Sequence, residues 1–275
     1  MQKLREHGHL VIPTSRSELN SSSIMESLIK NYQIDTIVNC AAWTDVDSAE
    51  INRDLAYEAN AGIVAKLAKL AKKNSIKFLQ VSTDYVFSGD NDRPYKPGDK
   101  CEPVNYYGYT KYVGERFALD IYPENSYVIR TAWLYSPYGN SFFGKILAKA
   151  FQGDSVSVVD SQKGQPTLVD DLARQMIQII TKPLPPGIYH ATNSGETSWY
   201  DYAVKIYELS GHDVSLVLKK DAMTGHQTVK RPSYSVLNNS SHENHGLLPL
   251  RNWERALDET IAKVLIEPTG VKLGD

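Results

Sequence analysis

Apolar segments alternate with helical segments along the first half of the chain, and this alternation limits the fold more than any other feature. Residues 35–43, 76–87 and 126–135 are apolar almost throughout, as in strands that are buried on both faces. Between them lie segments with apolar residues at helical spacing, such as residues 56–70. Buried strands that alternate with helices form a parallel sheet covered on both faces. We therefore expect an α/β fold with a doubly wound parallel sheet, to which residues 9–14 add a further strand.

The second half of the chain has a looser pattern of helices, short strands and Pro/Gly turns. The whole chain has 275 residues, a length that suits one large domain or two smaller ones. We expect residues 1–135 to carry the sheet. Residues 136–275 should form mainly a smaller C-terminal α/β substrate lobe, with some segments returning to the first domain. Thr197 is the expected N-cap of one of the later helices.

Charge and cysteine content exclude several classes of protein. The net charge of −2 provides no basic field for nucleic acid or an anionic membrane. Two cysteines cannot form a disulfide scaffold or a cysteine-based zinc site, and they suit a reducing cytoplasm. No apolar run reaches the roughly 18 residues of a membrane span, and the N-terminus lacks the apolar stretch of a secretory signal. The run His242–His245 is interpreted as a polar loop, and no metal is expected there.

The front of the chain lacks a feature that such sheets normally carry. A Rossmann-like sheet that binds NAD(P) opens with a strand, a glycine-rich turn and a helix that together hold the phosphates. Neither G-x-G-x-x-G nor G-x-x-G-x-x-G occurs in the sequence, and residues 1–8 resemble the last turns of a helix that ends at Gly8. We expect the NAD(P)-binding domain to be N-terminally truncated by that unit, with poor folding or weak cofactor binding as the consequence. Arg16 follows the expected strand at 9–14 and could meet a ribose 2′-phosphate, or it is a solvated loop arginine.

Tyr107 and Lys111 form a Y-x-x-x-K pair at the start of a predicted helix. The spacing of four residues places both side chains on one helix face. A free tyrosine has a pKa of about 10, and a nearby ammonium should bring it toward the working range of a proton donor. Ser82, Thr83 and Asp84 follow a buried strand at the edge where α/β sheets bind ligands. The two hydroxyls could hold a carbonyl and the carboxylate could orient a sugar hydroxyl; the alternative is an ordinary capped turn.

A turn of small residues follows the strand at 35–39. Cys40, Ala41 and Ala42 would let a cofactor lie against the backbone, although tight packing between strand and helix explains them equally well. Asn60 falls in a helix interior, where asparagine is mildly unfavourable. It either braces the neighbouring strand end or faces water.

These motifs resemble, in order, those of the dTDP-4-dehydrorhamnose reductases, a family of extended short-chain dehydrogenases. The similarity extends from about residue 8 to about residue 260. It rests on "VNCAAWTDVDSAE", "STDYVFSGDNDRPYK", "PVNYYGYTKYVGE", "IRTAWLYSPYGNSF", "VVDSQKGQPT", "GETSWYDYA" and "RPSYSVL". The resemblance implies NADPH- or NADH-dependent reduction of a nucleotide-linked 4-keto sugar to dTDP-L-rhamnose, so carbohydrate biosynthesis is the expected role.

The resemblance also assigns roles to residues. It implies that Tyr107 donates the proton with Lys111 as its partner, and that Thr83 tunes the reacting carbonyl. It implies sugar-nucleotide contacts by three side chains: Thr83, Asp84 and Trp133. It implies that the cofactor meets the turn after the second predicted strand and the side chains around it: Asn39, Ala41, Ala42, Trp43, Thr44, Asn60, Ser82, Tyr107 and Lys111.

Some features depart from the family pattern. Ser161 stands where many relatives carry Asp, and no counterpart of the glycine loop is present. Some relatives bind Mg²⁺ between subunits through carboxylates; Asp170 could match one of them, but no metal is claimed. Homodimers are implied by the resemblance alone. The same fold also occurs in the regulatory beta subunit of methionine adenosyltransferase, so a non-catalytic interaction protein is the alternative function.

Overall fold

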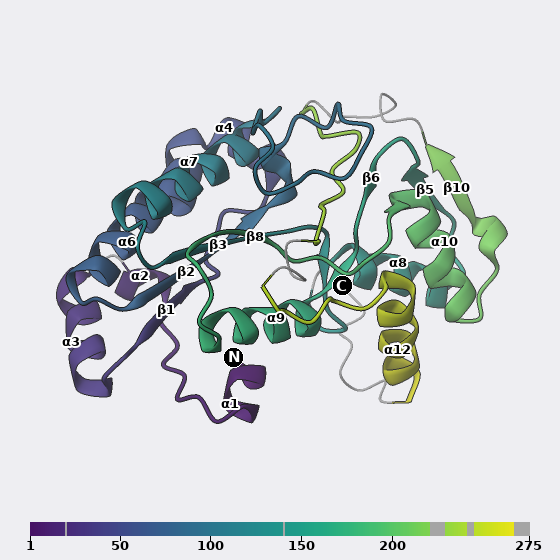
Figure 1. Cartoon of the computed structure of the whole chain (residues 1–275). Coiled ribbons are helices and arrows are strands. Elements are labelled where there is room, and N and C mark those ends of the chain that lie inside the picture. The colour runs from purple at the N-terminus through teal and green to yellow at the C-terminus, as the bar shows by residue number, and fades with distance from the viewer. Residues whose placement is uncertain (20, 140, 221–228, 241–244, 267–275) are drawn as a thin grey trace.

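A parallel sheet forms the centre of the first domain. The computed structural model describes residues 1–19, 21–139, 141–220, 229–240 and 245–266. Its main sheet has the order β1 (Thr36–Asn39), β2 (Lys77–Thr83), β3 (Ser126–Thr131) and β8 (Gly187–His190), and every neighbouring pair is parallel (Figure 1). The expected α/β fold with a parallel sheet is confirmed.

Helices cover both faces of this sheet, as apolar strands require. α3 (Ser22–Tyr32), α6 (Ile63–Lys73) and α7 (Tyr106–Ile121) share a core with Phe78 and Val128. On the opposite face, α9 (Val169–Thr181) packs with a second core that contains Leu79 and Ile129. Figure 1 shows α6 and α7 above the sheet and α9 below it. Adjacent strand residues thus serve opposite cores, which explains why the strands are apolar at every position.

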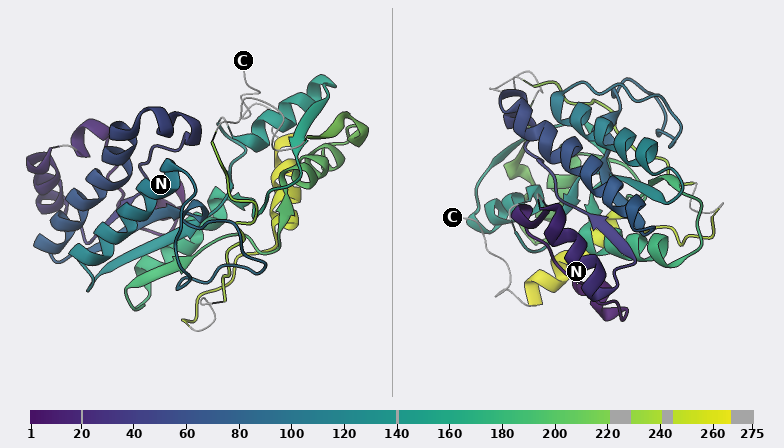
Figure 2. Two further views of the ribbon diagram at one scale, coloured as in Figure 1. Left: turned by 90° about the horizontal axis from the view of Figure 1, so that it is seen from above. Right: turned by 90° about the vertical axis from the view of Figure 1, so that its left-hand side faces the viewer.

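A smaller lobe lies beside the carboxyl ends of the strands (Figure 2). Its elements surround one further core and are α8 (Phe142–Gln152), β5 (Val156–Val159), α10 (Trp199–Leu209), β10 (Val217–Lys220) and α12 (Trp253–Ile266). β5 and β10 pair in parallel. α9 and β8 come from the same half of the chain, but β8 is a strand of the main sheet and α9 packs on that sheet.

The remaining elements are short. They are α1 (Gln2–Glu6), α2 (Arg16–Leu19), α4 (Val46–Ile51), α5 (Arg53–Tyr57), the π-helix η1 (Glu58–Gly62), the 3₁₀ turns η2 (Asp84–Val86) and η3 (Val214–Leu216), and the two-residue strands β4 (Leu134–Tyr135), β6 (Lys163–Gly164), β7 (Thr167–Leu168) and β9 (Thr197–Ser198). No helix among the described residues has the length and apolar character needed to cross a membrane.

Two local predictions were wrong. Residues 9–14 form no strand, and β1 pairs only with β2 among the described strands. An extended segment without a hydrogen-bonded neighbour gains no ladder energy, which explains why an apolar composition alone did not make a strand there. The N-cap of α10 is Ser198, whose side chain accepts from the Asp201 N–H, and Thr197 is the residue before it in β9. The predicted N-terminal helix is present as α1, and Gly8 follows it with a φ of 81°.

Candidate active site

The first turn of α7 places Tyr107 against the carboxyl end of β2. The helix begins after Asn105, whose side chain accepts a 2.8 Å hydrogen bond from the Gly108 N–H. Gly108 is packed so closely that a Cβ atom there would lie 2.1 Å from the Tyr85 carbonyl oxygen. The rings of Tyr85 and Tyr107 meet edge to face, with centroids 5.8 Å apart. The cap and the glycine therefore fix the Tyr107 ring beside the turn that follows β2.

Thr83, the last residue of β2, joins Tyr107 to Asp84. Its hydroxyl donates a 2.9 Å hydrogen bond to Asp84 Oδ1 and lies close enough to the Tyr107 phenol to affect the pKa of that group. Burial raises the pKa of Tyr107 to about 12; the Thr83 hydroxyl opposes this shift, and the charge of Asp84 adds to it. The phenol therefore remains protonated at neutral pH and is able to donate a proton.

Lys111 lies one helical turn after Tyr107 and is only 4% exposed. Its ammonium donates a 2.6 Å hydrogen bond to the Val81 carbonyl oxygen. Burial lowers the pKa of Lys111 to about 8, against the opposing charge of Glu115. The expectation that Lys111 would bring the Tyr107 pKa toward neutrality was wrong. The pKa of that phenol is raised because its burial dominates, while the ammonium is held on the β2 backbone.

Ser82 and Asp84 flank Thr83 but differ in their relation to it. Adjacent side chains leave a strand on opposite faces, so Ser82 does not share the side of Thr83. The Ser82 hydroxyl is buried and has no hydrogen-bond partner within the described residues. Asp84 begins η2, and burial raises its pKa to about 6, against the opposing hydroxyls of Ser235 and Thr83. The structure thus joins Asp84, but not the Ser82 hydroxyl, to Thr83 and Tyr107.

The turn after β1 is held by two asparagines. Asn39 donates to Gln80 Oε1 over 2.7 Å and accepts from the Ala41 N–H over 3.1 Å. Asn60, which is 1% exposed in η1, accepts from the Trp43 N–H over 2.8 Å and donates to the Trp43 carbonyl oxygen over 3.0 Å. Of the two interpretations of Asn60, the structure therefore supports the brace.

The same brace reaches α7. Asn60 Nδ2 also donates over 2.9 Å to the Thr110 hydroxyl, which in turn donates to the Tyr107 carbonyl oxygen over 2.8 Å. The turn after β1 and the first turn of α7 are therefore connected through one buried amide.

Two features of this edge of the sheet bear on the predicted cofactor site. Cys40 and Thr44 are exposed and Ala41 and Ala42 are half-buried, so the turn presents its backbone and small side chains rather than packing them away. The Lys111 ammonium has three N–H donors, and a single hydrogen bond from it occurs within the described part of the chain. The other donors are available to ribose hydroxyls. Arg16 is exposed at the start of α2, and no hydrogen bond among the described residues joins it to this cluster.

Trp133 lies two residues beyond β3, whose Thr131 is in register with Thr83 of β2. It is half-buried and has a φ of 44°, a conformation that bulky residues rarely adopt. The predicted sugar contact therefore sits on the edge of the sheet that carries Thr83 and Asp84.

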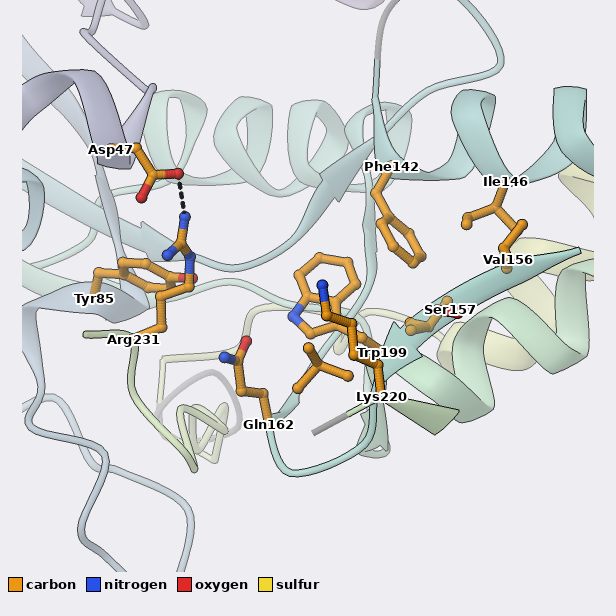
Figure 3. A pocket seen from close by; sticks show the side chains of 12 residues that line it. Asp47, Tyr85, Phe142, Ile146, Val156, Ser157, Gln162, Trp199, Lys220 and Arg231 are labelled. Carbon is orange, nitrogen blue, oxygen red and sulfur yellow. Dashed lines mark hydrogen bonds and ion pairs between the residues drawn. The ribbon is translucent and has the colours of Figure 1, made fainter. Parts of the chain in front are cut away.

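A cavity of about 480 Å³ lies next to these residues, between the sheet domain and the smaller lobe. Figure 3 shows Asp47, Tyr85 and Arg231 at one end of it and Phe142 near the other. Arg231 forms a 2.7 Å ion pair with Asp47. The lining combines aromatic and aliphatic side chains with two cations and several polar groups. Its members are Asp47, Tyr85, Phe142, Ile146, Val156, Ser157, Val158, Val159, Gln162, Trp199, Lys220 and Arg231.

Sequence reasoning missed most of this lining. Trp199 and Arg231 lie in "TSWYDYA" and "RPSYSVL", which served only as family markers. Tyr85 lies inside the quoted motif after β2, so its position was a usable signal. Phe142 is the last residue of the quoted motif "IRTAWLYSPYGNSF", whereas Lys220 lies in a segment without a functional pattern.

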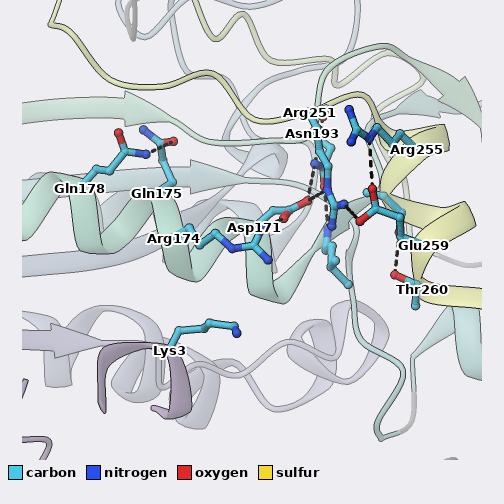
Figure 4. A network of polar contacts seen from close by, with 12 residues as sticks. Lys3, Asp171, Arg174, Gln175, Gln178, Asn193, Arg251, Arg255, Glu259 and Thr260 are labelled. Carbon is cyan, nitrogen blue, oxygen red and sulfur yellow. Dashed lines mark hydrogen bonds and ion pairs between the residues drawn. The ribbon is translucent and has the colours of Figure 1, made fainter. Parts of the chain in front are cut away.

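One carboxylate of α9, that of Asp171, takes part in a structural network (Figure 4). Asp171 is 1% exposed and accepts from Arg174, Arg251 and Asn193 over 2.6–2.9 Å. Asp170, the residue considered for Mg²⁺, is exposed. Within the described ranges, no group of three or more His, Cys, Asp or Glu side chains is arranged to hold a metal. Residues 242–244 of the histidine-containing run lie outside the described residues.

Residues 1–266 match the family model described as the RmlD substrate binding domain. The chain is 38% identical over 257 residues to a dTDP-4-dehydrorhamnose reductase of Streptomyces griseus, covering 92% of this chain and 82% of the relative. It is 36% identical to a dTDP-4-keto-6-deoxy-D-glucose reductase of Streptomyces niveus, covering 93% and 89% of the two chains.

Solved structures agree with these relatives. The dTDP-4-dehydrorhamnose reductase of Bacillus anthracis, determined in complex with NADP, superposes with a TM-score of 0.89 at 31% identity, covering 95% of this chain and 94% of that one. A dTDP-4-dehydrorhamnose reductase from Clostridium acetobutylicum gives a TM-score of 0.89 at 35% identity, with coverage of 96% and 94%. The fold, the ordered motifs and these similarities together show that the chain belongs to the dTDP-4-dehydrorhamnose reductase family.

Proposed function

We propose that the chain reduces the C4 keto group of dTDP-4-dehydro-L-rhamnose to dTDP-L-rhamnose. One observation carries this proposal: Thr83, Tyr107 and Lys111 converge where β2 and α7 meet, beside a cavity with aromatic and cationic walls. A bound nicotinamide cofactor would supply the hydride. On hydride addition at C4 the carbonyl π electrons would move to oxygen, and Tyr107 would neutralise the resulting alkoxide with its phenol proton.

Each residue of the trio has a separate task in this proposal. Thr83 holds Tyr107 and presents its hydroxyl to the same carbonyl oxygen. Tyr107, with its pKa raised to about 12, enters the reaction protonated. Lys111 binds the nicotinamide ribose with its remaining donors and provides positive charge as the phenolate forms. The low-polarity surroundings that shift both pKa values also strengthen these interactions.

The turn after β1 would receive the cofactor along Ala41, Ala42, Trp43 and Thr44, while Asn39 and Asn60 hold that turn in place. The Bacillus anthracis relative was determined with NADP, which supports NADPH as the cofactor. Arg16 is assigned to the 2′-phosphate only as a prediction, because the structure leaves it outside the cluster. NADH is the alternative hydride donor, and no Mg²⁺ site is proposed.

The cavity fits a nucleotide sugar. Arg231 and Lys220 provide positive charge for a diphosphate, and Phe142 and Trp199 provide flat apolar surface for a base. Asp84 and Trp133, at the sheet edge, are left for the sugar. A regulatory role without catalysis is not favoured, because no observation requires it and the trio is intact.

The test is NADPH oxidation by the chain with dTDP-4-dehydro-L-rhamnose, with the product identified as dTDP-L-rhamnose. Tyr107→Phe should lower kcat by on the order of a hundredfold or more, since the proton donor is lost and the ring packing is kept. Tyr109→Phe, an exposed tyrosine on the same helix, is the matched control and should leave kcat unchanged. Equal rates for wild type and Tyr107→Phe would remove Tyr107 from the reaction.

A further inference from the structure

The strained backbone at Trp133 is held by Trp199 and Gly164, neither of which has been given a role at the sugar. The indole of Trp133 stacks face to face on that of Trp199, with ring centroids 3.5 Å apart and planes 8° from parallel. Gly164 supports the stack from another side: a Cβ atom there would lie 2.4 Å from Trp133 Cε2. Gly164 pairs with Thr197 between β6 and β9, so the glycine and Trp199 belong to one local unit.

This unit belongs to the smaller lobe, whereas Trp133 continues from the main sheet. A bulky residue at positive φ persists only when its surroundings compensate for the strain. Here the stacked indole and the missing side chain at position 164 provide that compensation. The Trp133 carbonyl oxygen also accepts from the Thr167 N–H over 3.2 Å, which fixes the backbone next to the stack.

Trp199 has a second set of contacts. It lines the 480 Å³ cavity and meets the ring of Phe142 at a centroid distance of 4.5 Å (Figure 3). The residue that supports Trp133 is therefore also a wall of the site proposed for the nucleotide. A change at Trp199 can therefore alter both the wall of the nucleotide site and the position of Trp133.

We propose that Trp199 is a positioning residue that holds Trp133 in its left-handed conformation at the sugar subsite, with Gly164 leaving the space for it. The inference rests on the proposed function, because it names Trp199 as the support of a sugar contact. Trp199 would touch the nucleotide side of the cavity, and its effect on the sugar would pass through Trp133.

The stack itself can be tested without any activity. Two parallel indoles give an exciton couplet in far-ultraviolet circular dichroism. The wild-type chain should show this couplet, and Trp133→Phe, Trp199→Phe and Gly164→Ala should each abolish it. Gly164→Ala is the informative variant because it keeps both indoles and only fills the space against Trp133. A couplet that survives Gly164→Ala, or that the wild type lacks, would overturn the proposal.

The positioning role is tested by calorimetric binding of dTDP-L-rhamnose and of dTDP. Trp199→Ala should weaken the binding of dTDP-L-rhamnose by about tenfold more than the binding of dTDP. The reason is that the support of the sugar contact is lost in addition to any nucleotide contact. Trp199→Phe should restore part of the affinity for dTDP-L-rhamnose and so reduce the difference between the two ligands. Tyr200→Ala, the neighbouring aromatic residue on α10, is the matched control and should leave both affinities unchanged. Equal losses for the two ligands would overturn the proposal.

Turnover separates this inference from the function it rests on. In an active chain, Trp199→Ala should lower kcat/KM for the keto sugar by about tenfold while KM for NADPH stays within about twofold. A wild-type chain that shows the couplet and binds dTDP-L-rhamnose, but does not reduce the keto sugar, would contradict the reductase function while supporting the positioning role.

Discussion

Burial sets the protonation of the three ionisable side chains at the proposed site. Tyr107 is held protonated, Lys111 loses part of its affinity for a proton, and Asp84 gains some. The residue types and the spacing of Tyr107 and Lys111 could be predicted from the sequence. The direction of the Tyr107 shift could not, because burial is produced by packing against segments distant in the chain.

The Lys111 pKa of about 8 predicts an alkaline limb in the pH profile of kcat/KM. The ammonium is present below this pH and is lost as pH rises through it, so reductive activity should fall above about pH 8. Lys111→Arg keeps a positive charge at every accessible pH, although its different shape should reduce the rate. Its residual activity should lack the limb. The same limb in Lys111→Arg would assign the titration to another group.

Asp84 predicts an effect on stability. Its folded pKa of about 6 lies above the ordinary aspartate pKa of 3.8, so the folded state binds more protons than the unfolded state between these values. The buried carboxylate therefore costs stability above about pH 6, by about 3 kcal/mol, and the cost disappears as pH falls to about 4. Asp84→Asn should raise the free energy of unfolding near neutral pH and leave it unchanged near pH 4, as measured by urea denaturation.

Asp99 provides a control of opposite sign. The hydrogen bond from Arg93 lowers the pKa of Asp99, and the backbone N–H of Lys96 acts in the same direction. Asp99→Asn should therefore destabilise the protein near neutral pH rather than stabilise it. A loss of stability for Asp84→Asn at neutral pH would contradict this prediction, because it would show that hydrogen bonds offset the cost of burying the carboxylate.

At the scale of elements, the π-helix η1 connects the cofactor turn to α7. A π-turn adds a residue to a helix and often occurs at functional sites. Here it contains Asn60, whose amide makes the three bonds to Trp43 and Thr110. A Cβ atom at Gly114 of α7 would lie 2.2 Å from the Asn60 carbonyl oxygen, so the two helices also approach closely.

Asn60→Ala should therefore affect cofactor binding more than chemistry. Loss of the buried amide leaves its partners unpaired and should cost about 2 kcal/mol of unfolding free energy. KM for NADPH should rise by roughly tenfold as the turn at Ala41–Thr44 loses its support, with a smaller change in kcat. Asn74→Ala removes an exposed helix-end amide and is the control. An unchanged KM in Asn60→Ala would mean that the turn keeps its shape without the brace.

The types of the secondary-structure elements could be predicted from the sequence more readily than the strands with which they pair. Continuous apolar runs predicted the strands β1, β2 and β3, and the i, i+4 pair of Tyr107 and Lys111 marked α7. The expected strand at 9–14 failed because strand formation depends on a neighbour that local composition does not specify. Thr197 and Ser198 both suit an N-cap and both lie in β9, so the sequence did not distinguish them; α10 begins at Trp199, which makes Ser198 the cap.

At the scale of the whole molecule, the proposed site is closed by a segment that returns from the second half of the chain. Ser233 donates to the Gly89 carbonyl oxygen over 2.8 Å, and the Tyr95 N–H donates to Val236 over 2.8 Å. These contacts tie the returning segment to the loop after β2, and the Arg231–Asp47 ion pair ties it to α4. Such pairings join residues more than a hundred positions apart, which explains why the cavity could not be predicted from local patterns.

The homodimer implied by the family resemblance belongs to the molecule as a whole, and it stays a prediction.

The most direct measurement of the central claim follows the hydride itself. The chain is given dTDP-4-dehydro-L-rhamnose and NADPH deuterated at the transferable position of the nicotinamide, and the nucleotide-sugar product is examined by mass spectrometry and NMR. Direct transfer predicts dTDP-L-rhamnose that carries one deuterium at C4, with no incorporation when unlabelled NADPH is used in deuterated water. Unlabelled product from the deuterated cofactor, or no product at all, would contradict the account.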